Sequence, residues 1–220
     1  MRNLTLLAAA AGLIGVIALA VISAPPANIE LEEPRFRTPV ELADGLALGR
    51  PDAPLTMEIW SDFQCPACES FTRQMEPLLV NEYVATGAVR LVYRDMSFLG
   101  PESVSAAVAA RAAAEQGAFW PYHDYLFANQ VPSHNVGNFS TGRLEAMAVA
   151  VGLDLDAFRA AMADRELRQA VAATDHAAGL AGVSSTPTLV IDGQLLQGVP
   201  ASYSALKEII EAALPGSSAE

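Results

Sequence analysis

The sequence DFQCPAC at residues 62–68 is the stretch from which the fold can be inferred. It holds the protein's only two cysteines, Cys65 and Cys68, and it directly follows the apolar run 55–60. Hydrophobic residues recur at helical spacing after it, so a strand is predicted to end and a helix to begin here. Pro66 suits the first helical position, because its missing N–H would have no partner there.

This position has consequences for the sulfur chemistry. Cys65 is predicted to lie at the helix N-cap, close to unpaired backbone N–H groups and the positive end of the helix dipole. These groups stabilise a thiolate, which is the reactive form of cysteine. Cys68 lies one turn further on the same face, close enough to form a small disulfide ring with Cys65. The pattern therefore predicts thiol–disulfide exchange.

Two other interpretations of the cysteine pair are weaker. Zinc usually takes four ligands, but the chain has no second cysteine pair and its three histidines, His123, His134 and His176, show no ligand spacing. No metal is therefore expected, and His123 is expected to pack in the core. A purely structural disulfide is also disfavoured, because so short a loop constrains the unfolded chain little.

Length and charge narrow the possible functions. At 220 residues the chain can form one domain with a sizeable core. Its net charge of -12 argues against nucleic acid, whose phosphates require clustered lysine and arginine. No glycine-rich nucleotide fingerprint is present, and no cofactor is expected.

The N-terminal residues 1–24 resemble a targeting segment. Arg2 precedes an apolar run at 4–22, which is longer than the roughly 7–15 residues of a signal-peptide core. Because about 20 apolar residues can span a bilayer, we expect a retained membrane anchor in preference to a cleaved signal. Either outcome places the domain outside the cytoplasm, where disulfides persist.

The rest of the chain alternates between sheet and helix patterns. Residues 25–44 are proline-rich and aperiodic, which predicts a tether. Strands are expected at 55–60 and 89–93, joined by a helix that Pro77 interrupts. A strand, a helix and a strand at this spacing predict a parallel pair with a right-handed crossover.

A helical block separates the two parts of the sheet. Helices are predicted at residues 103–116, 119–127, 141–151, 155–162 and 165–180. The sheet pattern resumes at 188–191, and Asp192-Gly193 predicts a hairpin turn before a last strand at 195–197. An amphipathic helix at 202–214 and a disordered tail at 215–220 complete the expected order.

Four stretches together resemble the DsbA-like branch of the thioredoxin superfamily. They are GRPDAPLT at 49–56, SDFQCPAC at 61–68, FWPYH at 119–123 and GVSSTPT at 182–188. Their order and spacing hold from about residue 45 to 212. The resemblance implies an α/β, thioredoxin-like fold with an inserted α-helical subdomain. Its first part would be 45–100, its helical insertion 101–182 and its second part 183–214.

The resemblance also assigns a role to a second loop. It implies that Thr186–Pro187 is a cis peptide facing the cysteines, and that the backbone of Thr186 pairs with a substrate peptide. From the residues alone, Pro187 could equally open a strand. Phe63, Pro66 and the Thr186–Pro187 loop are expected to form a shallow apolar surface that receives unfolded chains.

The sequence departs from the family pattern in two places. The buried acid that usually lies six residues before the first cysteine is replaced by Ile59, and strand alternation turns Glu58 to the opposite face. We therefore assign Glu58 no proton-relay role. Ala67 replaces a histidine that helps stabilise the Cys65 thiolate, and the acidic Asp62 and Glu69 are expected to disfavour that thiolate further.

The combined expectation is an extracytoplasmic thiol–disulfide oxidoreductase that introduces disulfides into exported proteins. The resemblance implies unfolded exported proteins as substrates and a membrane quinone-linked thiol oxidase as reoxidising partner, and a monomer is expected. The same chemistry run as a reductase is the first alternative. A non-catalytic, chaperone-like binding module is the alternative from a different class.

Overall fold

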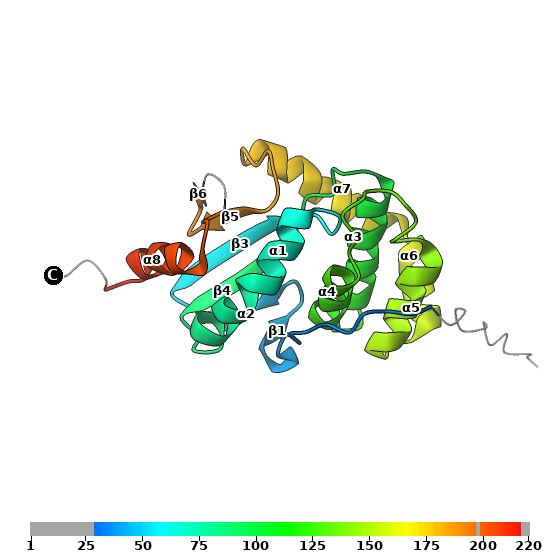
Figure 1. Ribbon diagram of the computed structural model, residues 1–220, viewed down its shortest axis with the longest axis horizontal. Coiled ribbons are helices and arrows are strands. Elements are labelled where there is room, and N and C mark those ends of the chain that lie inside the picture. Colours follow the sequence, from blue (N-terminus) through cyan, green and yellow to red (C-terminus); the bar gives the residue numbers. More distant parts are fainter. Residues whose placement is uncertain (1–28, 197–198, 217–220) are drawn as a thin grey trace, which may run out of the picture.

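The computed structural model describes residues 29–196 and 199–216 (Figure 1). The expected anchor at 1–24, the strand end at Gln197 and residues 217–220 of the expected tail lie outside these ranges. Over the described part of the chain, no helix is long and apolar enough to cross a membrane.

A six-stranded mixed sheet forms the centre of the fold, in the order β1-β2-β4-β3-β5-β6. The strands are β1 Ala43–Asp44, β2 Ala47–Leu48, β3 Leu55–Ser61, β4 Val89–Asp95, β5 Thr188–Ile191 and β6 Gln194–Leu196. β3 pairs with β4 in parallel and with β5 antiparallel. The predicted parallel pair is confirmed. β1 and β2 were not predicted, because two residues are too few to show an alternating pattern.

The helix after the cysteines is broken at Met75, two residues before Pro77, as the position of this proline led us to expect. Its parts are α1 Pro66–Gln74, α2 Glu76–Leu79 and the π-helical turn η2 Val80–Val84. Met75, between α1 and α2, has a φ of -110°. Pro77 has no N–H with which to continue the hydrogen bonds of α1. The break directs Glu76 into the core, where it is 1% exposed.

Five helices lie between β4 and β5 in the sequence and gather beside the sheet in Figure 1. They are α3 Pro101–Ala114, α4 Phe119–Ala128, α5 Thr141–Val151, α6 Leu155–Ala163 and α7 Arg165–Leu180. The predicted helical insertion is therefore present. Asp154 caps α6, since its side chain accepts from the Ala157 N–H. The last helix, α8 Tyr203–Ala213, packs on the sheet through Leu206 and Ile210.

The described part of the expected tether packs on the domain. The backbone N–H and the hydroxyl of Thr38 donate to the Asp124 carboxylate at 2.7 and 3.0 Å. The Glu32 N–H donates to the Asn129 side chain at 2.8 Å. Because these contacts satisfy single polar groups and not a periodic apolar face, the sequence pattern did not reveal them. The domain therefore includes a strap that runs from residue 29 to the turn η1, Val40–Leu42.

Candidate active site

The two cysteines lie at the junction of β3 and α1. Cys65 is the N-cap of α1, with φ -77° and ψ 118°, and Pro66 is the first helical residue. The Cys65 carbonyl accepts the N–H groups of Cys68 and Glu69, which begins the helix. Cys65 is 8% exposed and Cys68 is fully buried, and both are free thiols. The local geometry predicted around Cys65 is therefore confirmed.

A loop from the far end of the chain lies against the Cys65 sulfur. The Thr186–Pro187 peptide is cis, as the resemblance implied. The Cys65 thiol donates to the Thr186 carbonyl oxygen across 3.4 Å between sulfur and oxygen. The Thr186 hydroxyl is buried without a geometrically acceptable partner in the described structure, yet the Thr186 side chain lowers the pKa of Cys65. The loop before β5 thus completes the surroundings of the sulfur.

The two thiols differ in acidity. The pKa of Cys65 is lowered to about 5, first by its hydrogen bond with the Cys68 side chain and then by the Thr186 side chain and the N–H groups of Cys68 and Ala67. These effects outweigh its partial burial. The pKa of Cys68 is raised well above its ordinary value by complete burial and by the adjacent Cys65. The pair therefore ionises first at Cys65.

The pKa of Cys65 is low although Asp62 and Glu69, which were expected to disfavour its thiolate, lie nearby in sequence. Both carboxylates have other partners. Asp62 accepts from the N–H groups of Gln64, Phe98 and Leu99 and from the Ser103 hydroxyl, at 2.7 to 3.1 Å. Glu69 pairs with Arg73 at 2.7 Å.

The Asp62 contacts belong to a polar network that the sequence analysis missed. The Gln64 amide donates to the Ser103 hydroxyl at 2.8 Å, and its oxygen accepts the Asn135 N–H at 2.7 Å. These bonds attach the cysteine loop to α3 and to the loop before α5. One local signal was available, because aspartate is a residue type that favours Asx turns. The Asp62 side chain forms such a turn by accepting from the N–H of Gln64, two residues further on.

The predicted role of Phe63 in the apolar substrate surface is wrong. It is 1% exposed and its ring stacks on Tyr93, with the centroids 5.2 Å apart. It therefore belongs to the core and cannot form part of a surface for substrates. Pro66 is exposed, as that role requires. Two exposed apolar residues that sequence reasoning missed, Phe98 at 52% and Val136 at 60%, lie on the loops that bind Asp62 and Gln64.

The base of the site, around Cys68, combines apolar side chains with the hydroxyls of Ser61 and Tyr93. Ile59, in the position of the usual acid, is 2% exposed. The Ser61 hydroxyl is buried without a geometrically acceptable partner in the described structure, yet the Ser61 side chain lowers the pKa of Cys68 against the effect of burial. Glu58 forms an ion pair with Arg94 at 2.5 Å. The Glu58 carboxylate is therefore paired with Arg94, and no catalytic role is assigned to it.

A cysteine pair at a helix N-terminus, facing a cis-proline on a mixed sheet, defines the thioredoxin-fold class of thiol proteins. A thioredoxin family model, Thioredoxin_4, matches residues 41–212. The chain therefore belongs to this family, and it is a DsbA-like member of the thioredoxin superfamily.

Relatives of known sequence include two kinds of protein. The disulfide bond formation protein D of Bacillus subtilis is 25% identical over 181 residues, which cover 77% of each chain. The Na⁺/H⁺ antiporter NhaA 3 of Salinispora tropica is 37% identical over 167 residues, covering 75% of this chain. The matched region is 24% of that antiporter, so the chain spans about a quarter of its length.

Solved structures share the fold. Oxidised BdbD from Bacillus subtilis superposes with a TM-score of 0.72 at 22% identity, covering 82% of this chain and 97% of BdbD. A thioredoxin-like oxidoreductase from Silicibacter pomeroyi gives a TM-score of 0.64 at 29% identity, covering 76% of this chain and 90% of its own.

Proposed function

We propose that this protein is a thiol–disulfide oxidoreductase that introduces disulfides into exported proteins through the Cys65–Cys68 pair. The observation that carries the proposal is the lowered pKa of Cys65, at about 5, beside the raised pKa of Cys68. A stabilised Cys65 thiolate favours the dithiol form, so the disulfide form is a good oxidant. The similarity to disulfide bond formation protein D supports this direction.

The first step is attack on the Cys65 sulfur. A substrate thiolate forms a bond to Cys65 Sγ while the Cys65–Cys68 bond breaks and its electron pair moves to Cys68. Because Cys68 is fully buried, only Cys65 is open to attack. The Ser61 side chain and the Asp62 backbone favour the departing thiolate, which then takes up a proton because the pKa of Cys68 is high.

The second step releases the product. A second thiolate of the substrate attacks the substrate sulfur of the mixed disulfide, and Cys65 departs as a thiolate. Its low pKa makes it a good leaving group. Two substrate thiols have then become one disulfide, and the enzyme holds one thiolate at Cys65 and one thiol at Cys68. One of the two substrate protons stays on Cys68 and the other goes to solvent.

Substrate contact is proposed at the surface around Cys65. The backbone of Thr186 would pair with an extended segment of the substrate, as in strand addition. Pro66, Phe98 and Val136 would supply apolar contact next to it, in place of the buried Phe63. Such a surface suits unfolded chains, because it requires exposed backbone and small apolar contacts and no particular folded shape.

Location and partners follow from the sequence and the family resemblance. The apolar run at 4–22 supports an anchored, extracytoplasmic domain. A membrane quinone-linked thiol oxidase would return the Cys65–Cys68 dithiol to the disulfide, and the domain would act as a monomer.

Single-turnover transfer tests the proposal. The oxidised protein is mixed with a reduced, unfolded protein that has two cysteines, and free thiols are counted with a maleimide reagent. We expect one substrate disulfide for each Cys65–Cys68 disulfide consumed, and none with Cys65→Ala. If insulin disulfides are reduced readily while transfer to the dithiol substrate fails, the reductase alternative holds. Full biological activity of Cys65→Ala would establish the binding module.

A further inference from the structure

The Cys68 sulfur must gain and lose a proton during exchange, yet it is fully buried. This requirement rests on the proposed exchange chemistry at Cys65 and Cys68. The side chain of Ile59, in the position of the usual acid, has no proton to exchange. A titratable group elsewhere on the buried side of Cys68 would meet the requirement, because water does not reach the sulfur.

Asp95 lies on the strand beside Ser61 and on the Cys68 side of the sheet. β3 and β4 are parallel, and Ser61 is the register partner of Asp95. Neighbouring strands lie about 4.7–4.9 Å apart, and side chains alternate between the two faces along each strand. Ile59 and Tyr93 are also register partners, two residues earlier, so they share the face of Ser61 and Asp95. Both belong to the core cluster that contains Cys68.

Two buried oxygen atoms in this region lack hydrogen-bond partners in the described structure, Ser61 Oγ and Asp95 Oδ1. Arg111 on α3 approaches the other oxygen of Asp95, Oδ2, with Nε and Nη2 both at 2.6 Å. A serine hydroxyl has three staggered positions, so it can face the Cys68 sulfur in one and donate to Asp95 Oδ1 in another. Buried oxygens without partners are costly, and a contact between these two would satisfy both.

The Tyr93 hydroxyl links Asp95 and Cys68 to one cluster. Burial raises the pKa of Tyr93 well above its ordinary value, and the charges of Asp95 and then Cys68 add to the rise. The Ser61 side chain lowers the pKa of both Tyr93 and Cys68. Because such effects weaken with distance, the four polar groups lie close to one another.

We propose that Asp95 exchanges the proton of Cys68 through the hydroxyl of Ser61. Asp95 does not touch the sulfur, so it is a positioning residue that acts through Ser61. When Cys68 departs as a thiolate, the Ser61 hydroxyl gives its proton to the sulfur and takes one from the Asp95 carboxyl group. The resulting carboxylate stays paired with Arg111.

The same route runs in reverse when the dithiol is reoxidised. A disulfide of the oxidising partner is attacked by the Cys65 thiolate, which leaves a mixed disulfide at Cys65. The Cys68 proton then passes to Ser61 while the Ser61 proton passes to the Asp95 carboxylate. Cys68 Sγ forms its bond to Cys65 Sγ, and the partner's sulfur departs as a thiolate. The protein's two thiols are oxidised and the partner's disulfide is reduced.

Asp62 is the other buried carboxylate near the cysteines, and it is less suited to this role. Its two oxygens accept four hydrogen bonds, three from backbone N–H groups and one from the Ser103 hydroxyl. Burial raises the pKa of Asp62 against the effect of these donors. Both of its oxygens are nevertheless occupied, whereas Asp95 keeps Oδ1 available.

Charges on three elements set the proton affinity of Asp95. Burial raises its pKa to about 6, Arg111 on α3 lowers it, and Asp175 on α7 and Asp62 before α1 raise it. At neutral pH the group is therefore mainly a carboxylate that can take the Cys68 proton, and its acid form remains within reach. A pKa near the working pH is the favourable value for a group that both takes and gives a proton.

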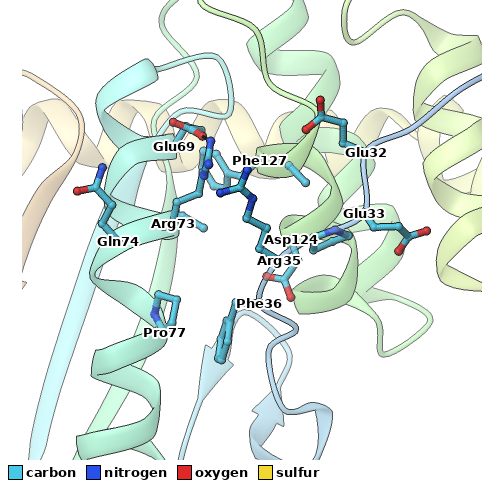
Figure 2. Close-up of a pocket in the computed structure, with 13 residues that line it drawn as sticks. Glu32, Glu33, Arg35, Phe36, Glu69, Arg73, Gln74, Pro77, Asp124 and Phe127 are labelled. Carbon is cyan, nitrogen blue, oxygen red and sulfur yellow. Dashed lines mark hydrogen bonds and ion pairs between the residues drawn. The ribbon is translucent and has the colours of Figure 1, made fainter.

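Water can approach Asp95 from the side of α7. Arg111 Nη2 also donates to the Thr174 hydroxyl at 2.8 Å, and Thr174 lines a cavity of about 380 Å³. A larger cavity of about 610 Å³ lies between α1–α2, α4 and the N-terminal strap (Figure 2). The described residues that line this larger cavity include neither Cys68 nor Asp95. Protons from solvent are therefore expected to reach Asp95 past Arg111.

The rate at which Cys68 closes the disulfide ring tests the proposal. The dithiol protein is mixed with excess glutathione disulfide and quenched with acid at set times. Mass spectrometry then separates the Cys65–glutathione adduct from the ring-closed disulfide. In the unaltered chain, closure is expected to accelerate with pH through about 6 and then level off, because the Asp95 carboxylate is the base. A rate proportional to hydroxide from about pH 5 to 8 would overturn the proposal.

Asp95→Asn keeps the side-chain shape but cannot take the proton. At pH 7 it is expected to slow ring closure by about tenfold or more and to remove the inflection near pH 6. Formation of the Cys65 adduct should keep its rate, which also reports that the variant is folded. The matched control Asp175→Asn removes another carboxylate that faces Arg111 and is expected to retain the inflection.

A double replacement tests the route through Ser61. In a Ser61→Ala background, Asp95→Asn is expected to have little further effect on closure, because the route is already interrupted. An undiminished effect there, or an inflection retained by Asp95→Asn, refutes the proposal, and if Asp95→Asn does not fold, the pH profile of the unaltered chain decides. An adduct that closes without the inflection refutes this inference alone, whereas a chain that forms no Cys65 adduct refutes the proposed function as well.

Discussion

Cys65 and Cys68 are separated by one helical turn, but their surroundings differ in kind. Cys65 lies at the helix N-terminus beside the Thr186–Pro187 loop, where N–H groups and side chains favour a thiolate. Cys68 is enclosed by the core, where burial favours the neutral thiol. In the mechanism proposed above, this difference gives the two sulfurs different roles: the Cys65 sulfur accepts attack and departs easily, and the fully buried Cys68 sulfur carries the proton.

Different parts of the chain create the two environments. Cys65 is surrounded by the N-terminus of α1 and by the loop at Thr186, which is 121 residues away in sequence. β3 and β4 provide the base under Cys68 through Ser61 and Tyr93. The helical subdomain acts indirectly, since its Ser103 and Asn135 hold the cysteine loop in place. Substitutions can therefore test the environment of each sulfur separately.

Replacement of either sulfur should give the largest effects, and the two effects should differ. Cys65→Ser is expected to abolish exchange, because the only open sulfur is lost. Cys68→Ser is expected to retain attack by Cys65 on a disulfide but to accumulate the mixed disulfide, because no second thiol resolves it. Mass spectrometry after incubation with a disulfide-containing peptide distinguishes them. Equal adduct yields from the two variants would contradict the division of roles.

Removal of the Asp62 carboxylate should have the next largest effect, on stability. Asp62→Ala leaves three backbone N–H groups and the Ser103 hydroxyl without their acceptor. We expect the free energy of unfolding to fall by roughly 2–4 kcal/mol, measured by urea denaturation of the disulfide form. The matched control is Asp52→Ala, at an exposed carboxylate, which should change little. Similar results for both variants would show that the network does not hold the loop.

The acidity of Cys65 predicts a specific pH dependence. Thiolate absorbance near 240 nm in the dithiol form should titrate with a midpoint near pH 5. Because this pKa is below that of an unfolded cysteine, the ionised thiolate stabilises the folded dithiol form. This stabilisation is complete above the ordinary thiol pKa of about 9 and is lost as the pH falls through about 5. The stability of the dithiol form relative to the disulfide form should therefore rise between these values.

The variant Thr186→Val tests how much the Thr186 side chain contributes to the low pKa of Cys65. It removes the hydroxyl that favours the thiolate and keeps a side chain of similar shape, so the absorbance midpoint should move to higher pH. An unchanged midpoint would assign the low pKa to Cys68 and the helix N-terminus alone.

The exposed apolar residues Phe98 and Val136, on the loops that bind Asp62 and Gln64, should affect substrate use moderately. Phe98→Ser with Val136→Ser is expected to raise KM for an unfolded protein substrate several-fold, while exchange with glutathione stays unchanged. Val149→Ser, an exposed valine on α5, is the control. If glutathione exchange falls equally, the two residues do not form a substrate surface.

Ser61→Ala should have the smallest effect, and it acts at Cys68. Loss of one hydrogen bond to the departing thiolate is worth about 1 kcal/mol, or roughly a fivefold slower attack on the disulfide. The Cys65 absorbance midpoint should stay in place. If the absorbance midpoint of Cys65 moves and the rate of attack on the disulfide stays the same, the Ser61 hydroxyl acts on Cys65 and not on Cys68.

The local part of this site could be predicted from the sequence. The apolar run before Cys65, Pro66 after it and the helical spacing that follows are short-range signals, and they located the strand, the N-cap and the helix. The position of Thr186–Pro187 against Cys65 required the family resemblance, because no local pattern links loops so distant in sequence.

Contacts between distant segments determine those features of the site that the sequence did not predict. Phe63 is apolar and lies two residues before Cys65, a position compatible with either a surface role or a core role. Its stacking on the ring of Tyr93 shows that it belongs to the core. The Asp62 carboxylate accepts from Phe98, Leu99 and Ser103, and no local sequence pattern links these residues to Asp62. The strap at Thr38 and the buried position of Glu76 depend on contacts between distant segments, which leave no period in the sequence.

We propose that stabilisation of the Cys65 thiolate makes the Cys65–Cys68 pair an oxidant. The reduction potential of this pair, measured by equilibrium against a glutathione series, tests that proposal. A value near about -120 mV, as in DsbA, is the predicted result. A value near about -270 mV, as in thioredoxin, would contradict the claim and favour the reductase alternative.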